Sequence, residues 1–240
     1  MLAKSSSQKW QSPKIEKPVN LIVGGYGSGK SEVSVNLARH LVLDESFVLR
    51  PISILDLDIV NPYFRSREAS AELKKLGISP INPEGGQFYA DLPIILPQIR
   101  GAIETAQGTL ICDVGGDDVG ARVLSSLATS FDPSSYDMNL VLNANRPFTS
   151  DVAGCIKTIT EIETSSRLKF TGVISNTHLM DETNEDIVMQ GIELSRKVSE
   201  ETGLALRFVS AEQHILEKIN QSTIDIPVLP LNRSLLKPWE

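Results

Sequence analysis

The stretch that decides the fold is "VNLIVGGYGSGKSEVSVNLARHL", residues 19–41. It opens with a short, mostly apolar run of the kind that forms a buried strand. A glycine-rich segment follows, and after it Val33, Leu37 and Leu41 recur at every fourth position. That spacing places their side chains on one face of a helix. The stretch therefore predicts a strand, a glycine-rich turn and an amphipathic helix, in that order.

The same succession of apolar runs and amphipathic segments continues along the rest of the chain. Most of the runs are continuous rather than alternating, which is typical of parallel strands covered by helices on both faces. We therefore predict an α/β fold with three layers, in which a doubly wound, mostly parallel sheet has about seven or eight strands. The predicted strands are 19–23, 52–57, 78–81, 109–114, 139–143, 169–175, 206–209 and 227–229, and the predicted helices after the first are 65–76, 93–107, 117–130, 149–166, 184–202 and 211–220.

The composition is that of one soluble domain. The 240 residues are 41% hydrophobic and 22% charged, which suits a single core. A net charge of −7 argues against nucleic acid as a partner, and no apolar run approaches the length of a membrane span. Residues 1–17 are lysine-rich and lack the apolar segment of a signal peptide. We expect a disordered basic tail over 1–17, a single domain over 18–240, and a cytoplasmic protein without membrane contact.

The glycine-rich turn matches the phosphate-loop pattern G-x-x-x-x-G-K-[ST] at every position, after a strand and before a helix. Glycines let backbone N–H groups converge on phosphate oxygens, and the helix N-terminus adds a favourable dipole. In this pattern the lysine reaches the β- and γ-phosphates and the final hydroxyl binds Mg²⁺. The residues predicted to bind a nucleoside triphosphate are Gly24, Gly25, Tyr26, Gly27, Ser28, Gly29, Lys30 and Ser31.

Acidic residues end two of the predicted strands, where ligands of open parallel sheets bind. The segment "ILDLDIV" places Asp56 and Asp58 two residues apart and so on one side of a strand. The segment "LICDVGGDD" places Asp113 at the end of an apolar run, in a D-x-x-G pattern. We predict that Asp58 and Asp113 serve the metal, together with Ser31. Asp56, Asp117 and Asp118 fit either such a role or a turn or helix cap.

In the order of these motifs, the chain resembles the P-loop class that contains the chromosome-partition ATPases, the septum-positioning ATPase, the nitrogenase iron protein and the cobyrinate-synthesis ATPases. The resemblance spans about residues 18–230 and includes "FVSAEQHILEKINQSTIDIPVL" near the C-terminus. It implies that Asp58 positions the attacking water, that Asp113 lies on the Mg²⁺ side, and that Asp117 is a second switch aspartate. It also implies that Asn176 touches the base.

Two departures from that class change the expectations. Partition-type members carry a lysine that reaches the partner subunit's nucleotide, and this chain has Gly25 at that position. Any homodimer must therefore use another cation, such as Arg65, Arg67 or Arg146. The iron protein has a cluster cysteine at the position of Gly120, so no iron–sulfur cluster is expected. The chain's two cysteines, Cys112 and Cys155, fall within a predicted strand and helix and are expected to be core thiols.

The segment Asn176-Thr177-His178-Leu179 bears on the base. Guanine-specific P-loop proteins use N-K-x-D, where the aspartate accepts hydrogen bonds from guanine. Leu179 cannot accept a hydrogen bond, so we expect ATP rather than GTP. His178 either flanks the base or is an ordinary polar loop residue.

Three further segments carry candidate contacts with open roles. "NANRPFTSD", residues 143–151, places Arg146 at a strand end as a ligand or a turn residue. "NPEGGQFYADLP", residues 82–93, suits a protein partner or a second substrate through Phe88 and Tyr89. Arg65 and Arg67 fit either a sensor of the γ-phosphate or a solvated helix face.

The favoured function is that of a slow, Mg²⁺-dependent switch ATPase, with ATP and Mg²⁺ as cofactors, Lys30, Asp58 and Asp117 in catalysis, and a protein client. The first alternative is a phosphotransferase or ligase similar to dethiobiotin synthetase, which would pass the γ-phosphoryl group to a small molecule. The second is a nucleotide-binding regulator that does not hydrolyse its ligand. The sequence names neither the client nor the oligomeric state.

Overall fold

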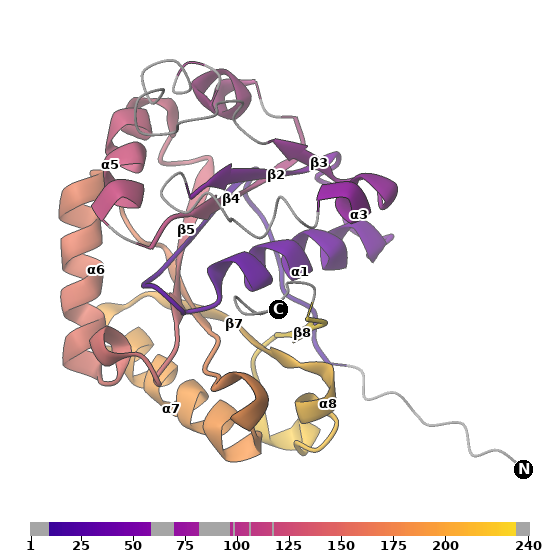
Figure 1. The fold of residues 1–240 in the computed structure, drawn as a ribbon, viewed down its shortest axis with the longest axis vertical. Coiled ribbons are helices and arrows are strands. Elements are labelled where there is room, and N and C mark those ends of the chain that lie inside the picture. Colours follow the sequence, from indigo (N-terminus) through magenta and orange to yellow (C-terminus); the bar gives the residue numbers. More distant parts are fainter. Residues whose placement is uncertain are drawn as a thin grey trace, which may run out of the picture.

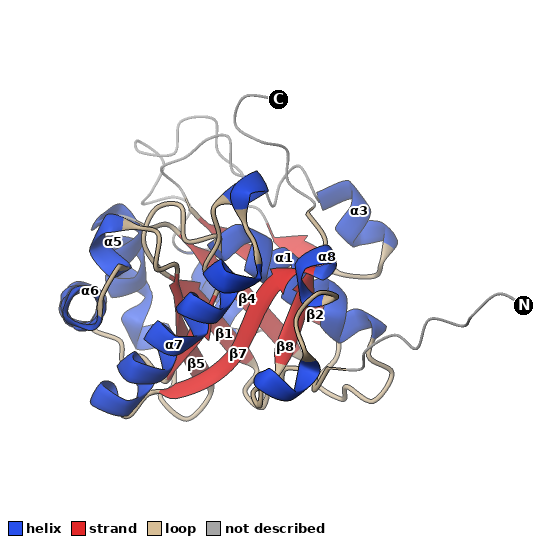
Figure 2. Ribbon diagram, turned by 90° about the horizontal axis from the view of Figure 1, so that it is seen from below, coloured by secondary structure: helices blue, strands red, loops and turns tan. Residues whose placement is uncertain are grey.

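The computed structural model describes residues 10–58, 70–81, 97, 99–105, 107–116 and 118–233, and the side chains of 118 and 119 lie outside that description. All eight strands are parallel, in the order β3-β2-β4-β1-β5-β6-β7-β8. Figure 1 shows the fold coloured along the chain. The strand with the phosphate loop, β1, lies inside the sheet, between β4 and β5, and is labelled there in Figure 2. The strands are β1 Val19–Val23, β2 Ile52–Leu57, β3 Ser79–Ile81, β4 Thr109–Val114, β5 Tyr136–Leu142, β6 Gly172–Ser175, β7 Ala205–Glu212 and β8 Val228–Leu231.

Helices cover both faces of this sheet, as Figure 2 shows for the strands enclosed between them. On one face α1 and α3 pack on a cluster that includes Ile22 and Val141, and on the other α5, α6 and the C-terminal part of α7 pack on Leu21 and Leu140. Adjacent residues of one strand are therefore both buried, which explains the continuous apolar runs. The helices are α1 Lys30–Leu43, α3 Ser70–Lys75, α5 Asp118–Leu127, α6 Val152–Ser166, α7 Glu185–Thr202 and α8 Gln213–Leu216.

The predicted three-layer α/β fold with seven or eight strands is confirmed. Three strands have the predicted bounds, namely β1, β2 and β4. Two errors concern polar residues inside strands: β5 begins three residues earlier than predicted, and β7 continues to Glu212. A third is at β6, which begins at Gly172 and not at Lys169. β5 includes Asp137, which is tolerated there because Arg207 donates to its Oδ1 over 2.8 Å. Because β7 is longer than predicted, the helix expected over 211–220 is reduced to the short α8.

The described part of the N-terminal segment packs on the domain. Gln11 accepts a hydrogen bond from the backbone N–H of Val228 over 2.8 Å, and Pro13 is buried. Lys17 donates from Nζ to the Tyr136 carbonyl over 3.0 Å. Residues 10–17 thus contact the N-terminal ends of strands, at β8 through Gln11 and at β5 through Lys17.

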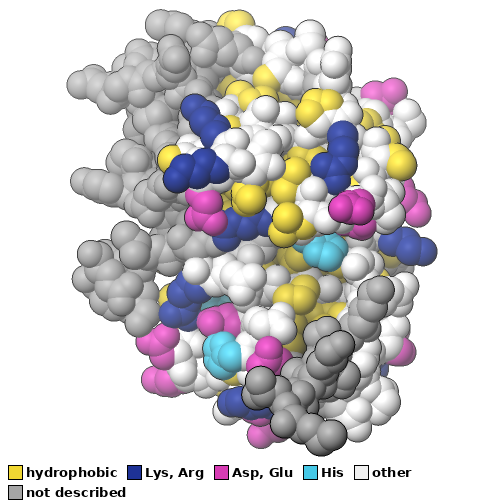
Figure 3. Space-filling view, turned by 90° about the vertical axis from the view of Figure 1, so that its right-hand side faces the viewer, with side chains coloured by type: hydrophobic (Ala, Val, Ile, Leu, Met, Phe, Trp, Pro, Cys, Tyr) yellow, Lys and Arg dark blue, Asp and Glu magenta, His cyan; other side chains and the backbone are white. Residues whose placement is uncertain are grey.

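The surface mixes the two signs of charge on the side shown in Figure 3, where basic side chains stand next to acidic ones and hydrophobic side chains lie between them. None of the helices in the described part of the chain has the length and apolar character needed to cross a bilayer.

Candidate functional site

The phosphate loop joins β1 to α1 and has the backbone that its glycines predict. Gly27 and Gly29 have φ values of +72° and +86°, in the left-handed region that favours glycine. Gly29 is the N-cap of α1, and its carbonyl accepts the first helical hydrogen bond, from Val33 N over 3.0 Å. The N–H groups of the first helical turn have no acceptor within the helix, so they can bind an anion.

Lys30 folds back over this loop. Its side chain is buried although it carries a charge, and Nζ donates to the Gly25 carbonyl over 3.2 Å. Gly116 lies directly against it, because a Cβ on Gly116 would come within 2.7 Å of the lysine Nζ. Lys30 is thereby held between the phosphate loop and the segment that follows β4.

Three side chains that follow two other strands, β5 and β6, hold the outside of the loop. Asn176, after β6, donates from Nδ2 to the Ser28 carbonyl over 2.7 Å and accepts at Oδ1 from the Ser210 hydroxyl over 3.0 Å. Arg146, after β5, donates from Nε to the Gly27 carbonyl over 2.9 Å. Asn143 lies 3.4 Å from the same carbonyl and is fully buried. The expected contact of Asn176 with the base stays a prediction; its amide contacts the loop.

The two predicted metal carboxylates lie on neighbouring strands. β2 and β4 pair so that Asp56 is in register with Asp113, and Asp58 follows directly after β2. A Cβ on Gly115 would lie 3.2 Å from Asp58 Oδ1, so the segment after β4 passes close to that carboxylate. The structure thus brings Lys30, Asp58 and Asp113 to one end of the sheet.

Asp113 is fully buried, and this burial raises the pKa of its carboxyl to about 7. This pKa of about 7 is the net result: the charge of Asp58 acts in the same direction as burial, whereas Lys30 and the Ser31 hydroxyl act against it. Ser31 therefore lies beside the Asp113 carboxylate at the start of α1.

This set of groups fits Mg²⁺. One hydroxyl and two carboxylates supply the oxygen ligands that Mg²⁺ prefers, and such sites usually take their remaining ligands from phosphates and water. Within the described ranges, three or more His, Cys, Asp and Glu side chains nowhere gather as a metal cage. The donor set of Ser31, Asp58 and Asp113 is therefore one that needs a nucleotide to complete it.

Asp56 has a different place from Asp58. It is 1% exposed, and its Oδ1 accepts the backbone N–H of Asp58 over 3.0 Å. It therefore orients the end of β2 from within the sheet. Asp117, Arg65, Arg67 and the 82–93 loop lie outside the described residues.

His178 faces the phosphate loop from the loop after β6. A Cβ on Gly29 would come within 3.3 Å of its Nε2. Burial, together with the charges of Arg146 and Arg233, lowers the pKa of the imidazole to about 4, against the opposing effect of a backbone hydrogen bond with Gly27. His178 is therefore neutral near pH 7. The next residue, Leu179, is 38% exposed.

Both cysteines are core thiols, as expected. Cys112 in β4 and Cys155 in α6 are completely buried, and burial raises the pKa of each thiol, that of Cys155 to about 12.

Sequence reasoning missed Asn143 and Ser210, and it gave Asn176 a different contact. Each of the three is a buried polar residue near the carboxyl end of a strand: Asn143 and Asn176 follow β5 and β6, and Ser210 lies two residues before the end of β7. That position, where an apolar run gives way to Asn or Ser, is the signal that identifies them.

No protein-family model matches the chain, and no curated protein matches it in sequence. In structure it is similar to the cell division protein FtsY of Thermotoga maritima, with a TM-score of 0.53 and 18% identity over 85% of this chain and 65% of that one. It is also similar to chloroplast FtsY of Physcomitrella patens, with a TM-score of 0.53 and 17% identity over 84% and 60% of the two chains. The signal recognition particle receptor FtsY of Elizabethkingia anophelis, in complex with GDP, gives 0.52 and 12% over 88% and 62%.

These likenesses show that the chain shares the fold of the FtsY structures, a parallel sheet with helices on both faces. They do not point specifically to the partition-type class that the sequence motifs resemble. The chain spans less than two thirds of the length of the FtsY chains named above.

Proposed function

We propose that the protein is a slow, Mg²⁺-dependent switch ATPase whose nucleotide state controls a protein partner. The observation that carries this proposal is the convergence of Lys30, Ser31, Asp58 and Asp113 at the complete phosphate loop. This set is the minimum that a P-loop protein needs to bind a triphosphate with its metal.

Phosphoryl transfer asks little covalent chemistry of the protein, so these residues act by position and charge. Lys30 and the first-turn N–H groups of α1 stabilise the charge on the phosphates. Ser31, Asp58 and Asp113 would hold Mg²⁺, which supplies further charge neutralisation when bound. Asp58 also orients the attacking water. Asp117, which lies outside the described residues, is the second switch aspartate that the resemblance implies.

ATP is the proposed nucleotide because Leu179 occupies the position where guanine recognition needs an aspartate. One of the FtsY structures is a complex with GDP, so GTP is the alternative nucleotide to test. Competition binding of ATP and GTP to the wild-type protein decides between them. A tighter complex with GTP would overturn the assignment of the base.

A protein partner is supported by two exposed aromatic side chains beside the loop. Tyr26, within the loop, is 85% exposed, and Phe148, two residues after Arg146, is 78% exposed. The hydrogen bond of Arg146 to Gly27 joins the segments that carry them. A partner that contacts both side chains would therefore sense a change in the phosphate loop.

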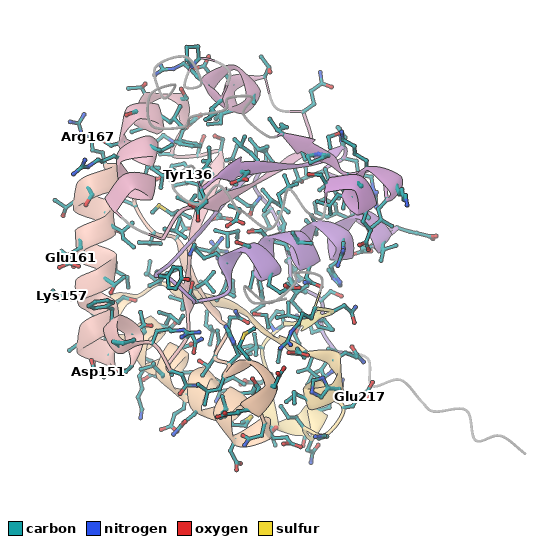
Figure 4. The ribbon with its side chains drawn as sticks, viewed as in Figure 1. Tyr136, Asp151, Lys157, Glu161, Arg167 and Glu217 are labelled. Carbon is teal, nitrogen blue, oxygen red and sulfur yellow. The ribbon has the colours of Figure 1, made fainter. Side chains whose placement is uncertain are left out.

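The test compares Lys30→Ala with Lys157→Ala. Lys157 lies on the outside of α6, with its side chain 75% exposed, and serves as the matched control (Figure 4). Isothermal titration with ATP and Mg²⁺ should show loss of binding in Lys30→Ala and normal binding in the control. Equal affinity in both variants would overturn the proposal.

A second experiment incubates the wild type with ATP and Mg²⁺ and analyses the products. Release of inorganic phosphate supports the ATPase. Transfer of the phosphoryl group to an added small molecule supports the phosphotransferase, and intact ATP supports the regulator.

A further inference from the structure

Arg146 contacts the phosphate loop through one of its five N–H donors. Among the described residues, Nε is the one donor of this side chain that is engaged, with the Gly27 carbonyl at 2.9 Å. Over the ranges that the structure describes, Arg146 forms an ion pair with no carboxylate. An arginine has five N–H donors and a permanent charge, so the guanidinium retains a full charge and free donors next to an anion site.

The position of the guanidinium is closely defined. A Cβ on Gly27 would fall within 2.7–3.0 Å of its Nε, Cζ and Nη2, so the group lies against the loop where only glycine leaves room. The backbone of Arg146 is fixed by two turns, because its N–H donates to the Asn143 carbonyl and its carbonyl accepts from Thr149 N, over 3.1 and 3.0 Å. The Thr149 hydroxyl also donates to the Asn143 carbonyl, over 2.8 Å.

The hydrogen bond of Arg146 to the Gly27 carbonyl also orients the next N–H group of the loop. The C=O and the following N–H of a planar trans peptide point in opposite directions. With the Gly27 carbonyl turned outward to Arg146, the Ser28 N–H turns inward, where it closes on the Gly25 carbonyl over 3.2 Å. Likewise the bond from Asn176 to the Ser28 carbonyl turns the Gly29 N–H into the loop.

The charge of Arg146 extends into the same site. The pKa of His178, whose ring faces the loop, is lowered partly by this guanidinium, after the larger effect of burial. A positive charge that disfavours protonation of a neighbouring imidazole also stabilises an anion bound in the loop. This stabilisation grows with the charge of the anion.

We propose that Arg146 is a positioning residue of the phosphate loop and the second cation of the site, favouring the triphosphate over the diphosphate. The role of Arg146 as a second cation rests on the proposed nucleotide function. Its role in positioning the loop does not, because that role belongs to the protein without nucleotide.

The experiment uses three variants of the full chain. Arg146→Gln removes the charge, and Arg146→Lys keeps the charge but lacks the Nε donor. Arg167→Gln is the matched control, because Arg167 is an exposed arginine far from the phosphate loop. It lies at the C-terminal end of α6, whereas Asp151, five residues after Arg146, lies at the N-terminal end of that helix (Figure 4). Circular dichroism and unfolding temperature establish that each variant folds.

The first readout is hydrogen exchange of residues 25–30 in the nucleotide-free protein. Both Arg146 variants should exchange these amides faster than the wild type and than Arg167→Gln. Unchanged exchange in both would overturn the positioning role, whatever the nucleotide results.

The second readout is the affinity for ATP and for ADP. Arg146→Gln should lose ATP affinity on the order of tenfold and lose less ADP affinity, while Arg146→Lys should recover the ATP-to-ADP ratio. An equal loss for ATP and ADP in Arg146→Gln would overturn the charge role. If the wild type binds neither nucleotide, the proposed function fails, and the exchange result still decides the positioning role.

Discussion

Asn176 donates a hydrogen bond from Nδ2 to the carbonyl oxygen of Ser28 over 2.7 Å, and this bond ties the end of β6 to the phosphate loop. Its Oδ1 accepts from the Ser210 hydroxyl at the other end of the same amide. Asn176 is 3% exposed, so both contacts lie away from water. The amide therefore links β6, β7 and the loop in one buried network.

Asn176→Asp should damage the protein more than Asn176→Ala. An ionised aspartate would place an acceptor oxygen against the Ser28 carbonyl, whereas alanine only removes the donor. Loss of the bond leaves a buried carbonyl without a partner, which costs about 1–3 kcal/mol of unfolding free energy. Urea unfolding and ATP titration measure both effects. If the aspartate variant is as stable as the wild type and binds ATP equally well, the network does not hold the loop.

Asp58→Asn should keep ATP binding and lose hydrolysis. Asp58 follows β2 and contacts the segment after β4, and the amide keeps its shape while removing the charge that orients a water. Single-turnover measurements separate the two steps. Asp225→Asn is the control for the loss of one carboxylate charge, because the Asp225 side chain is 77% exposed and pairs with Arg196 at the surface. Normal hydrolysis in Asp58→Asn would move the role to Asp117 or to a partner residue.

The raised pKa of Asp113 predicts a pH dependence of stability without nucleotide or metal. Between its ordinary pKa of 3.8 and about 7, the folded protein keeps a proton on Asp113 that the unfolded chain has lost. The folded state then binds more protons, so stability due to this group falls as pH rises through that window. Asp113→Asn should show a smaller loss of unfolding free energy between pH 5 and pH 8. The same pH dependence in both proteins would contradict the burial of a neutral carboxyl.

Gly172→Ala tests a close approach inside the sheet. A Cβ there would come within 2.6 Å of Arg207 Cγ and of Asn139 Oδ1, so Arg207 reaches Asp137 by crossing β6 at its glycine. Displacing Arg207 leaves the Asp137 carboxylate poorly paired, and the expected loss is about 1–3 kcal/mol of unfolding free energy.

Gly101→Ala is the control for that substitution, because a Cβ on this helical glycine meets nothing within 4 Å. Its unfolding free energy should stay equal or rise, since alanine favours helix. Similar stability of Gly172→Ala and the control would show that Arg207 can move at little cost.

Much of the fold could be predicted from the sequence because its signals are local. The glycines of the phosphate loop need left-handed φ values at Gly27 and Gly29, and β1, β2 and β4 are mostly apolar from end to end, so their bounds were predicted correctly. The errors at β5 and β7 arose where a distant partner makes a polar residue tolerable in a strand. Asp137 is read as a loop residue until Arg207, seventy residues later in the chain, is known to pair with it.

The candidate site divides in the same way. Lys30, Ser31, Asp58 and Asp113 stand in motifs and could be named from spacing. The hydrogen bonds of Asn143, Arg146 and Asn176 to the outside of the loop depend on strand order, which places β5 beside β1 and β6 beside β5. No spacing in the sequence states that order, so these contacts could be found only in three dimensions.

The last prediction concerns assembly and uses the open space at Gly25. A Cβ at this glycine meets nothing within 4 Å, and its φ is not among the positive values, so Gly25→Lys should fold with an unfolding temperature close to that of the wild type. By resemblance to the partition-type ATPases, a lysine here would neutralise the partner subunit's triphosphate, which otherwise repels its counterpart in a water-poor interface. With a non-hydrolysable ATP analogue, light scattering should therefore show dimers of Gly25→Lys. The wild type, which lacks this lysine, should stay monomeric or should dimerise only through another cation. A wild-type dimer that forms with the analogue and persists when Arg65, Arg67 and Arg146 are all replaced by glutamine would show that none of these cations is needed.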